Sequence, residues 1–260
     1  MNKKLRIGII FITTLVAIII AFSFAPIAQD QTYHAFADRR SFFGISNFND
    51  IVSNLLFIIF GLMGLAFLFN KESNKSQFSM HGEQFLWKVL FFGVILVGIG
   101  SGYYHINPEN STLVWDRLPM TIVFMAFLSL VIMERIDRNA ALILFPVLLV
   151  IGVGSVFYWD YTESLGEGDL RLYGLVQFLS LLLIAIIFWL FPAKYTGMKY
   201  LVFTIGWYAL AKLFEYFDKA IFDLLWNMVS GHSLKHIAAS IGAYTMLLYV
   251  KKRGIVGGLA

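Results

Sequence analysis

Residues 86–104 read LWKVLFFGVILVGIGSGYY, and Lys88 is the one charged side chain in this run. A helix needs about 20 mostly apolar residues to cross the hydrocarbon core of a bilayer. The run is about that long, and it lacks the alternation of apolar and polar residues found in the strands of membrane barrels. It therefore predicts a membrane-spanning α-helix.

The rest of the chain repeats this pattern. Hydrophobic residues make up 59% of the 260 residues and charged residues only 14%, whereas soluble domains carry about 25% charged residues. The mean hydropathy is +0.75. Because so few charges cannot cover a surface in water, lipid must cover much of the outside. We predict an all-α polytopic membrane helix bundle with eight spanning helices, at 6–26, 48–70, 86–104, 116–134, 139–158, 171–192, 198–217 and 232–250.

Composition also excludes several kinds of site. The chain has no cysteine, so disulfides and thiolate metal sites are excluded, and any zinc site must use His, Asp or Glu. The sequence shows no glycine-rich phosphate loop and no basic-aromatic pattern typical of nucleic-acid binding. The partners that we expect are the lipid bilayer and a membrane lipid, with no nucleic acid.

Lys and Arg in the short loops predict the orientation, because they are enriched on the cytoplasmic side. With the N-terminus in the cytoplasm, 13 of the 20 basic residues lie inside. The acidic loop at 159–170 then lies outside. We predict a multi-pass protein of the cell membrane with both termini in the cytoplasm. The basic residues placed inside are Lys3, Lys4, Arg6, Lys71, Lys75, Lys88, Arg135, Arg138, Lys194, Lys199, Lys251, Lys252 and Arg253.

We divide the chain into an N-terminal helix at 1–28, a seven-helix part at 29–253 and a C-terminal tail at 254–260. The start, MNKKLR before an apolar run, could also be a secretory signal. We favour an uncleaved helix, because the run is long for a signal and Pro26 is poorly placed for cleavage.

Ionisable residues gather at the outer ends of three predicted helices, where such residues are costly and usually functional. Ser101 and His105 end the third helix, Asp116 opens the fourth, and His232 and His236 open the eighth. Residues four apart share a helix face, so His232 and His236 can bind one metal ion. With His105 they make the three-ligand set of a catalytic zinc, whose fourth position holds water.

Each of the nearby polar groups has a predicted role. Zinc can lower the pKa of its water to about 7, Asp116 could carry a proton from the water to the leaving amine, and Ser101 could donate a hydrogen bond to the oxyanion.

The alternative is that the histidines only face a polar loop at a helix end. Arg117 could meet a lipid phosphate or extend to the interface, and we favour the interface. His34 could approach the site from above.

Four motifs together resemble the alkaline ceramidases, whose wider superfamily includes the adiponectin-type receptors. The resemblance covers about residues 36–250 and implies a seven-helix core with one added N-terminal helix. It also implies that this chain would be a zinc-dependent hydrolase that cleaves the amide bond of ceramide or a similar sphingolipid. The motifs are NDIVSNLLF at 49–57, GSGYYH at 100–105, WDRLPM at 115–120 and HSLKH at 232–236.

The resemblance implies the same zinc ligands, His105, His232 and His236, and the same catalytic pair, Ser101 and Asp116. The stretch KLFEYFDKAIFDLL at 212–225 is more similar to the prokaryotic branch of the family. Within it, Glu215 and Asp218 could orient a ligating histidine, or they could belong to a solvated helix end.

The loop before the second helix departs from the family. Alkaline ceramidases have an acidic loop there that binds calcium, and Asp38 and Asn47 stand at positions resembling its ligands. However, Asn47 replaces a glutamate, and Arg39 and Arg40 add positive charge. Calcium prefers several oxygen ligands with negative charge, so a calcium site here would be weak.

Three functions remain open at this stage. The first is a zinc-dependent amidohydrolase that acts on an N-acylated lipid. The second is a zinc-containing membrane receptor or scaffold of the same fold without turnover. A transporter ranks lowest, because the helix centres carry almost no charge.

Overall fold

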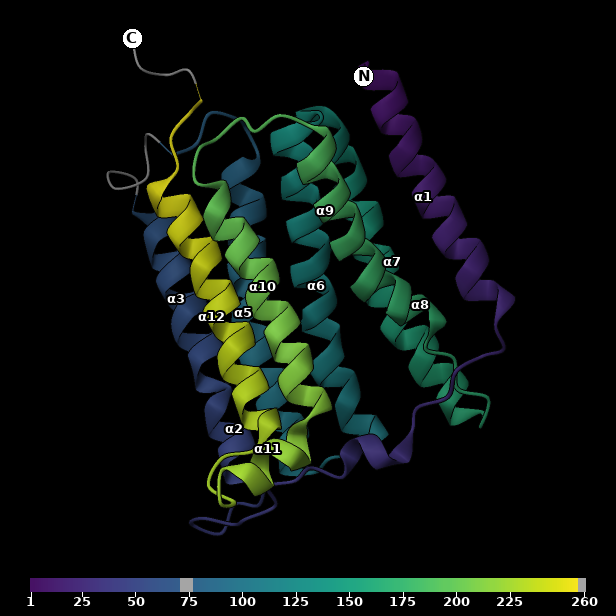
Figure 1. Cartoon of the computed structure of the whole chain (residues 1–260), viewed down its shortest axis with the longest axis vertical. Helices are drawn as coiled ribbons and strands as arrows, with labels where there is room; N and C mark the ends of the chain where they lie inside the picture. Colours follow the sequence, from purple (N-terminus) through teal and green to yellow (C-terminus); the bar gives the residue numbers. More distant parts are fainter. Residues whose placement is uncertain (71–76, 257–260) are drawn as a thin grey trace.

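The computed structural model describes residues 1–70 and 77–256, and the chain forms a bundle of long helices (Figure 1). Lys71, Lys75 and the last four residues of the predicted tail lie outside the described residues. No strand occurs in the described parts, where two isolated bridges are the only β pairing. The predicted all-α fold is confirmed.

Each predicted spanning segment corresponds to a helix or to consecutive helices. Two shorter helices, η1 (Gln31–His34) and α11 (Asp218–Leu224), were not predicted. The long segments are α1 (Lys3–Ser23), α2 (Phe48–Ser53) with α3 (Leu55–Phe69), α5 (Glu83–Ile106), α6 (Asn110–Arg135), α7 (Arg138–Ser164), α8 (Arg171–Gly174) with the π-helical turn η2 (Leu175–Leu179) and α9 (Ser180–Leu190), α10 (Met198–Tyr216) and α12 (Gly231–Lys252).

Six of these segments are long and apolar enough to cross a membrane, whereas α10 and α12 are more polar. The α10 sequence includes Lys212 and Glu215, and α12 includes His232, Lys235 and His236. Every one of these side chains lies near the site described below. Several of the residues that make the two helices more polar therefore belong to the candidate site.

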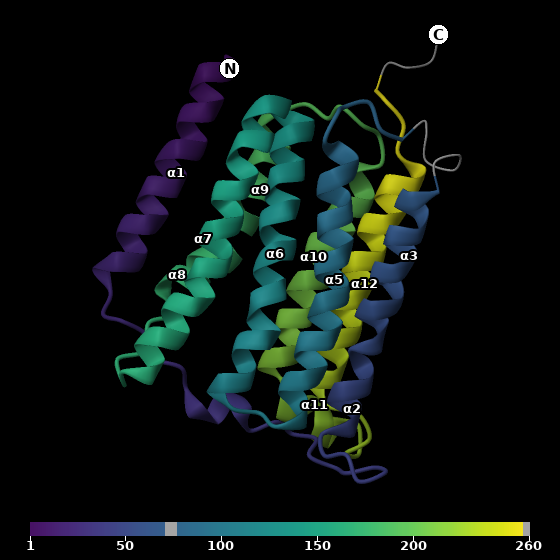
Figure 2. The ribbon, with the colours of Figure 1, turned by 180° about the vertical axis from the view of Figure 1, so that it is seen from behind.

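The long helices of the bundle pack side by side (Figures 1 and 2). α5 packs against α3 and α6, α6 against α7, and α12 against α10 and α3. α5 and α6 come close at Gly100, where a Cβ would collide with the backbone carbonyl of Trp115. α1 stands to one side, packs only lightly against η2 and α9, and has no buried residue.

The start of α1 and the end of α12 lie at one end of the bundle, and η1, α2 and α11 lie at the other (Figure 1). α5 ends there with His105, while α6 and α12 begin there, close to Asp116 and His232. The segment between α1 and α2 crosses this end of the bundle. Sequence-distant polar residues are thus brought to one depth, as predicted from the span pattern.

Candidate metal centre

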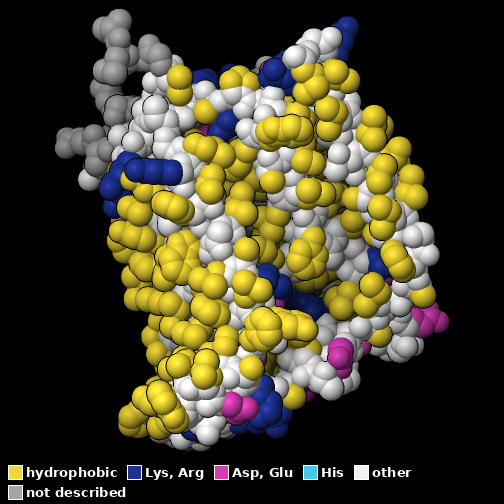
Figure 3. All heavy atoms as spheres, viewed as in Figure 1, with side chains coloured by type: hydrophobic (Ala, Val, Ile, Leu, Met, Phe, Trp, Pro, Cys, Tyr) yellow, Lys and Arg dark blue, Asp and Glu magenta, His cyan; other side chains and the backbone are white. Residues whose placement is uncertain are grey.

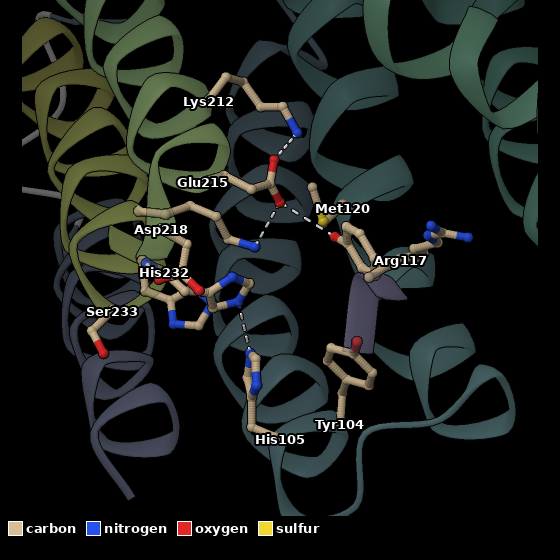
Figure 4. Close-up of polar contacts among 12 residues, drawn as sticks. Tyr104, His105, Arg117, Met120, Lys212, Glu215, Asp218, His232 and Ser233 are labelled. Atoms are coloured by element: carbon tan, nitrogen blue, oxygen red, sulfur yellow. Dashed lines mark hydrogen bonds and ion pairs between the residues drawn. The ribbon is translucent and has the colours of Figure 1, made fainter. Parts of the chain in front are cut away.

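Three histidines from two helices meet at the end of the bundle (Figure 4). His105, His232 and His236 are all buried, and one nitrogen from each lies within 4.8 Å of the others. Their ring centroids are 4.8–5.0 Å apart. Such a group can hold a metal ion, because imidazole nitrogen is a favoured ligand of zinc and similar metals.

The distances between the rings fit a shared ion. Nε2 of His105 lies 3.3 Å from Nε2 of His232. Two nitrogens that bind one tetrahedral zinc at 2.0–2.1 Å would be separated by roughly 3.3 Å. Nε2 of His236 is buried and has no hydrogen-bond partner among the described residues. A buried imidazole nitrogen without a partner is unfavourable, and a metal ion would satisfy it.

His236 is held by the start of the α2–α3 segment. Nδ1 of His236 lies 2.9 Å from the Ser53 hydroxyl and 3.3 Å from the Asn54 amide. The Ser53 hydrogen can point to the Asp50 carbonyl, 3.0 Å away, and its oxygen then accepts the Nδ1 hydrogen. This arrangement leaves Nε2 with its lone pair, which is the form that binds metal.

The first turn of α12 is fixed by two carboxylates. Asp218 accepts a hydrogen bond from the backbone N–H of His232 at 2.8 Å and another from Ala37 at 2.9 Å. Asp50 is fully buried and accepts from the Ser233 hydroxyl at 2.6 Å. Negative groups stabilise the N-terminus of a helix, so these contacts set where His232 stands.

Asp218 and Glu215 do not contact a histidine ring in the described structure. Asp218 acts on the backbone, as above, and Glu215 pairs with Lys235 at 3.0 Å and also with Lys212. The alternative of a solvated helix end does not describe Glu215, whose side chain is only 15% exposed.

Asp116 and Ser101 lie close to one another. The Ser101 hydroxyl is placed to interact with the Asp116 carboxyl as a hydrogen-bond donor. Both residues are buried, and both line a cavity of about 320 Å³ that His236 also lines. The proton carrier and oxyanion donor predicted from sequence thus share one cavity with a predicted metal ligand.

The two candidate calcium ligands already have protein partners. Asp38 binds Arg40 at 2.6 Å and accepts from the Asn49 amide at 2.9 Å. Burial by itself would raise the pKa of the Asp38 carboxyl, but the hydrogen bonds from Arg40 and Asn49 outweigh it and lower that pKa. The Asn47 amide donates to the His105 carbonyl at 3.0 Å. A positive guanidinium therefore stands beside Asp38, where a cation would have to bind.

The segment before α2 covers the site, which the sequence did not predict. Phe36 packs on the rings of His105 and His232, with centroids 4.7 Å and 4.3 Å away. His34 belongs to the same segment, and its ring contacts the Tyr104 hydroxyl at 2.8 Å and Asn110 at 2.9 Å. Phe36 and His34 lie in a stretch without helical periodicity, so no pattern indicated their contacts.

Asp50 and Lys235 were also missed by the sequence reasoning. Both stand in motifs that were noted, NDIVSNLLF and HSLKH. An acid at the start of an apolar helix is itself a signal of function, and it would have identified Asp50. Lys235 lies between the two histidines of α12 and is 17% exposed, although its spacing gives no hint of its partner on α10.

Comparison with known proteins identifies the family of this chain. No curated protein matches the chain. The family model described as Ceramidase matches residues 43–253, which include the three histidines, Ser101 and Asp116. Since the match covers most of the chain, this protein belongs to the ceramidase family.

Proposed function

We propose that this protein is an integral-membrane, zinc-dependent hydrolase that cleaves the amide bond of an N-acylated lipid. Membership of the ceramidase family implies a lipid amide hydrolase. The observation that supports a metal site is the group of three buried imidazoles, His105, His232 and His236, whose nitrogens lie close together. Zinc bound there would activate water and polarise the substrate carbonyl.

The residues around the metal site fit the other steps of amide hydrolysis. Asp116 is placed in the cavity where it can accept a proton from water and deliver it to the leaving nitrogen. The Ser101 hydroxyl can donate a hydrogen bond to the carbonyl oxygen as negative charge develops on it. A metal site with only a structural role would need neither group.

The cavity fits an acyl chain. Apart from its polar end it is lined mainly by apolar side chains of α6, η2, α10 and α12. It is partly open: Phe178 of η2 is 55% exposed, and Lys212 of α10 is 39% exposed. Figure 3 shows basic side chains within a hollow on this face of the bundle. We infer that the lipid enters sideways from the bilayer and that the site faces the outer side of the cell membrane.

The test is fatty-acid release from a panel of N-acyl lipids by the purified protein, with metal analysis of the same sample. We expect about one zinc per chain, loss of activity after chelation, and recovery with added zinc. Protein that keeps zinc but releases no fatty acid from any of the lipids would support the receptor alternative.

Asp116→Asn separates proton transfer from metal binding. We expect normal zinc content and a fall in turnover of about 10²–10⁴-fold, because the amide cannot carry the proton. Asp223→Asn is the control, since Asp223 is 59% exposed and lies at the same end of the bundle. Full activity of Asp116→Asn would remove Asp116 from the mechanism.

A further inference from the structure

The polar end of the cavity has more positive than negative side chains. Three basic residues line it, Arg117, Lys212 and Lys235, against two carboxyls, Asp116 and Glu215. Glu215 pairs with both lysines, and Figure 4 shows it between Lys212 and the histidines. One positive charge is therefore left over, and a zinc ion held by neutral histidines would add to it.

Arg117 has unused hydrogen-bonding capacity. It is 6% exposed, so it does not extend to the interface, as the sequence analysis favoured. Its guanidinium lies 4.3 Å from the ring centroid of Trp159 and 4.9 Å from that of Tyr173. Nη2 donates to the Gln29 side chain at 2.5 Å, whereas Nη1 is buried and has no hydrogen-bond partner among the described residues.

Tyr33 connects Arg117 to the lysines. Its ring centroid lies 5.8 Å from the guanidinium, and its hydroxyl donates to Glu215 at 3.3 Å. Arg117 is thus linked through Tyr33 to Glu215, and all three residues line the cavity.

A buried donor without an acceptor is unfavourable. A guanidinium matches the planar oxygens of a carboxylate, or those of a phosphate or sulfonate, better than any neutral group. A ligand with one negative charge would both satisfy Nη1 and balance the excess charge. A neutral alcohol, such as the head of a simple ceramide, could accept the hydrogen bond but would not balance the charge.

We propose that the amine part of the lipid substrate carries an acidic group, which Arg117 binds and the Lys212–Glu215–Lys235 cluster supports. The substrate class is then an N-acylated amino acid or a similar anionic N-acyl lipid. Hydrolysis adds water across its amide bond and releases a fatty acid and an amine that keeps the acidic group. This inference rests on the proposed function, since it assigns the substrate of that site.

Binding tests the inference without turnover. Metal-free protein in neutral detergent would be titrated with N-palmitoylglycine and with N-palmitoylethanolamine, which differ mainly by a carboxylate in place of an alcohol. We expect N-palmitoylglycine to bind at least tenfold more tightly. Palmitate is a third probe, because the released fatty acid also has a carboxylate. Palmitate binding as tight as that of N-palmitoylglycine, and equally weakened by Arg117→Gln, would assign Arg117 to the product and overturn the inference.

Variants locate the acidic group. Arg117→Gln should reduce the preference for N-palmitoylglycine at least tenfold, and Lys212→Gln should reduce it by a smaller factor. Because Lys212 is partly exposed, its variant should fold even if the Arg117 variant does not. Lys219→Gln is the control, since Lys219 is 83% exposed and pairs with Asp223. Equal preference in wild type and in both cavity variants would overturn the assignment.

Fatty-acid release from the same lipids separates the two proposals. If ceramide or N-palmitoylethanolamine is cleaved as efficiently as N-palmitoylglycine, the proposed function holds and the acidic-group inference fails. If N-palmitoylglycine binds in preference but no N-acyl lipid is cleaved, Arg117 binds an acidic group, whereas the proposed function and the substrate class assigned from it both fail.

Discussion

Both ends of the bundle bury ionisable side chains, but they use them differently. At the end where α5 begins and α12 ends, Arg253 is fully buried and lies 2.6 Å from Glu83 and 2.6 Å from Glu134. Tyr195 donates to Glu83 at 2.7 Å, and Tyr249 donates to Glu134 at 2.6 Å. There the protein supplies the partners of its own charges, and the ends of several helices are joined.

At the other end, some buried hydrogen-bonding groups lack a partner among the described residues. His236 and Arg117 each have a buried nitrogen without a hydrogen-bond partner in the described structure, and a cavity lies beside them. A buried polar group without a partner is costly. The comparison teaches that buried charges at one end pair with each other, whereas at the other end an incompletely paired cluster lies next to a cavity, which is where we propose that ligands bind.

The largest expected effect comes from removing a metal ligand. His232→Ala should abolish activity and reduce bound zinc to near zero, because two imidazoles do not retain a catalytic zinc as three do. Elemental analysis and fatty-acid release measure both. His81→Ala is the control, since His81 is exposed and belongs to the opposite end. Unchanged zinc in His232→Ala would place the metal elsewhere.

Breaking the paired cluster around Arg253 should lower the stability of the protein without lowering its zinc content. Arg253→Gln leaves two buried carboxylates without their cation, and we expect a loss of about 3–5 kcal/mol in the free energy of unfolding. Zinc content per folded molecule should not change. Thermal unfolding in detergent measures this loss. Arg138→Gln is the control and should change stability little, because Arg138 is exposed at the same end of the bundle. Loss of zinc from folded Arg253→Gln would show that the two ends are not independent.

The smallest effect concerns a residue that orients a ligand. Ser53→Ala removes the hydroxyl that holds Nδ1 of His236, and we expect metal affinity to fall about 10–100-fold. Competition with a chelator of known affinity measures this change. Ser23→Ala, at an exposed position of α1, should not alter it. Equal affinity in the two variants would mean that Ser53 does not orient the ligand.

Much of the fold followed from hydropathy, and part of the site followed from spacing. Apolar runs gave the helices and their order, so they also gave the depth of His105, Asp116 and His232 along the bundle. The i, i+4 spacing put His232 and His236 on one face. These predictions needed only periodicity and length, which are local properties of the sequence.

The remaining contacts depend on how helices rotate and on how an irregular segment lies, which hydropathy does not encode. Lys235 meets Glu215 across the α10–α12 interface, and Phe36 meets the histidines from a segment with no regular pattern. The same reason explains why Arg117 was expected at the interface and lies in an aromatic pocket instead. The depth of a residue along the bundle could be predicted from the sequence, whereas the direction in which its side chain points around the helix axis could not.

The segment between α1 and α2 has one more consequence. Gln29 and Tyr33 both contact groups that line the cavity, and Leu170 donates to the carbonyl of Ile27 at 2.9 Å. Proteolysis near residue 28 would create a new ammonium group next in sequence to Gln29, whose side chain accepts a hydrogen bond from Arg117. Processing, tagging or truncation of the N-terminal region would therefore change the surroundings of the Arg117 guanidinium, although α1 itself contributes no side chain to the cavity.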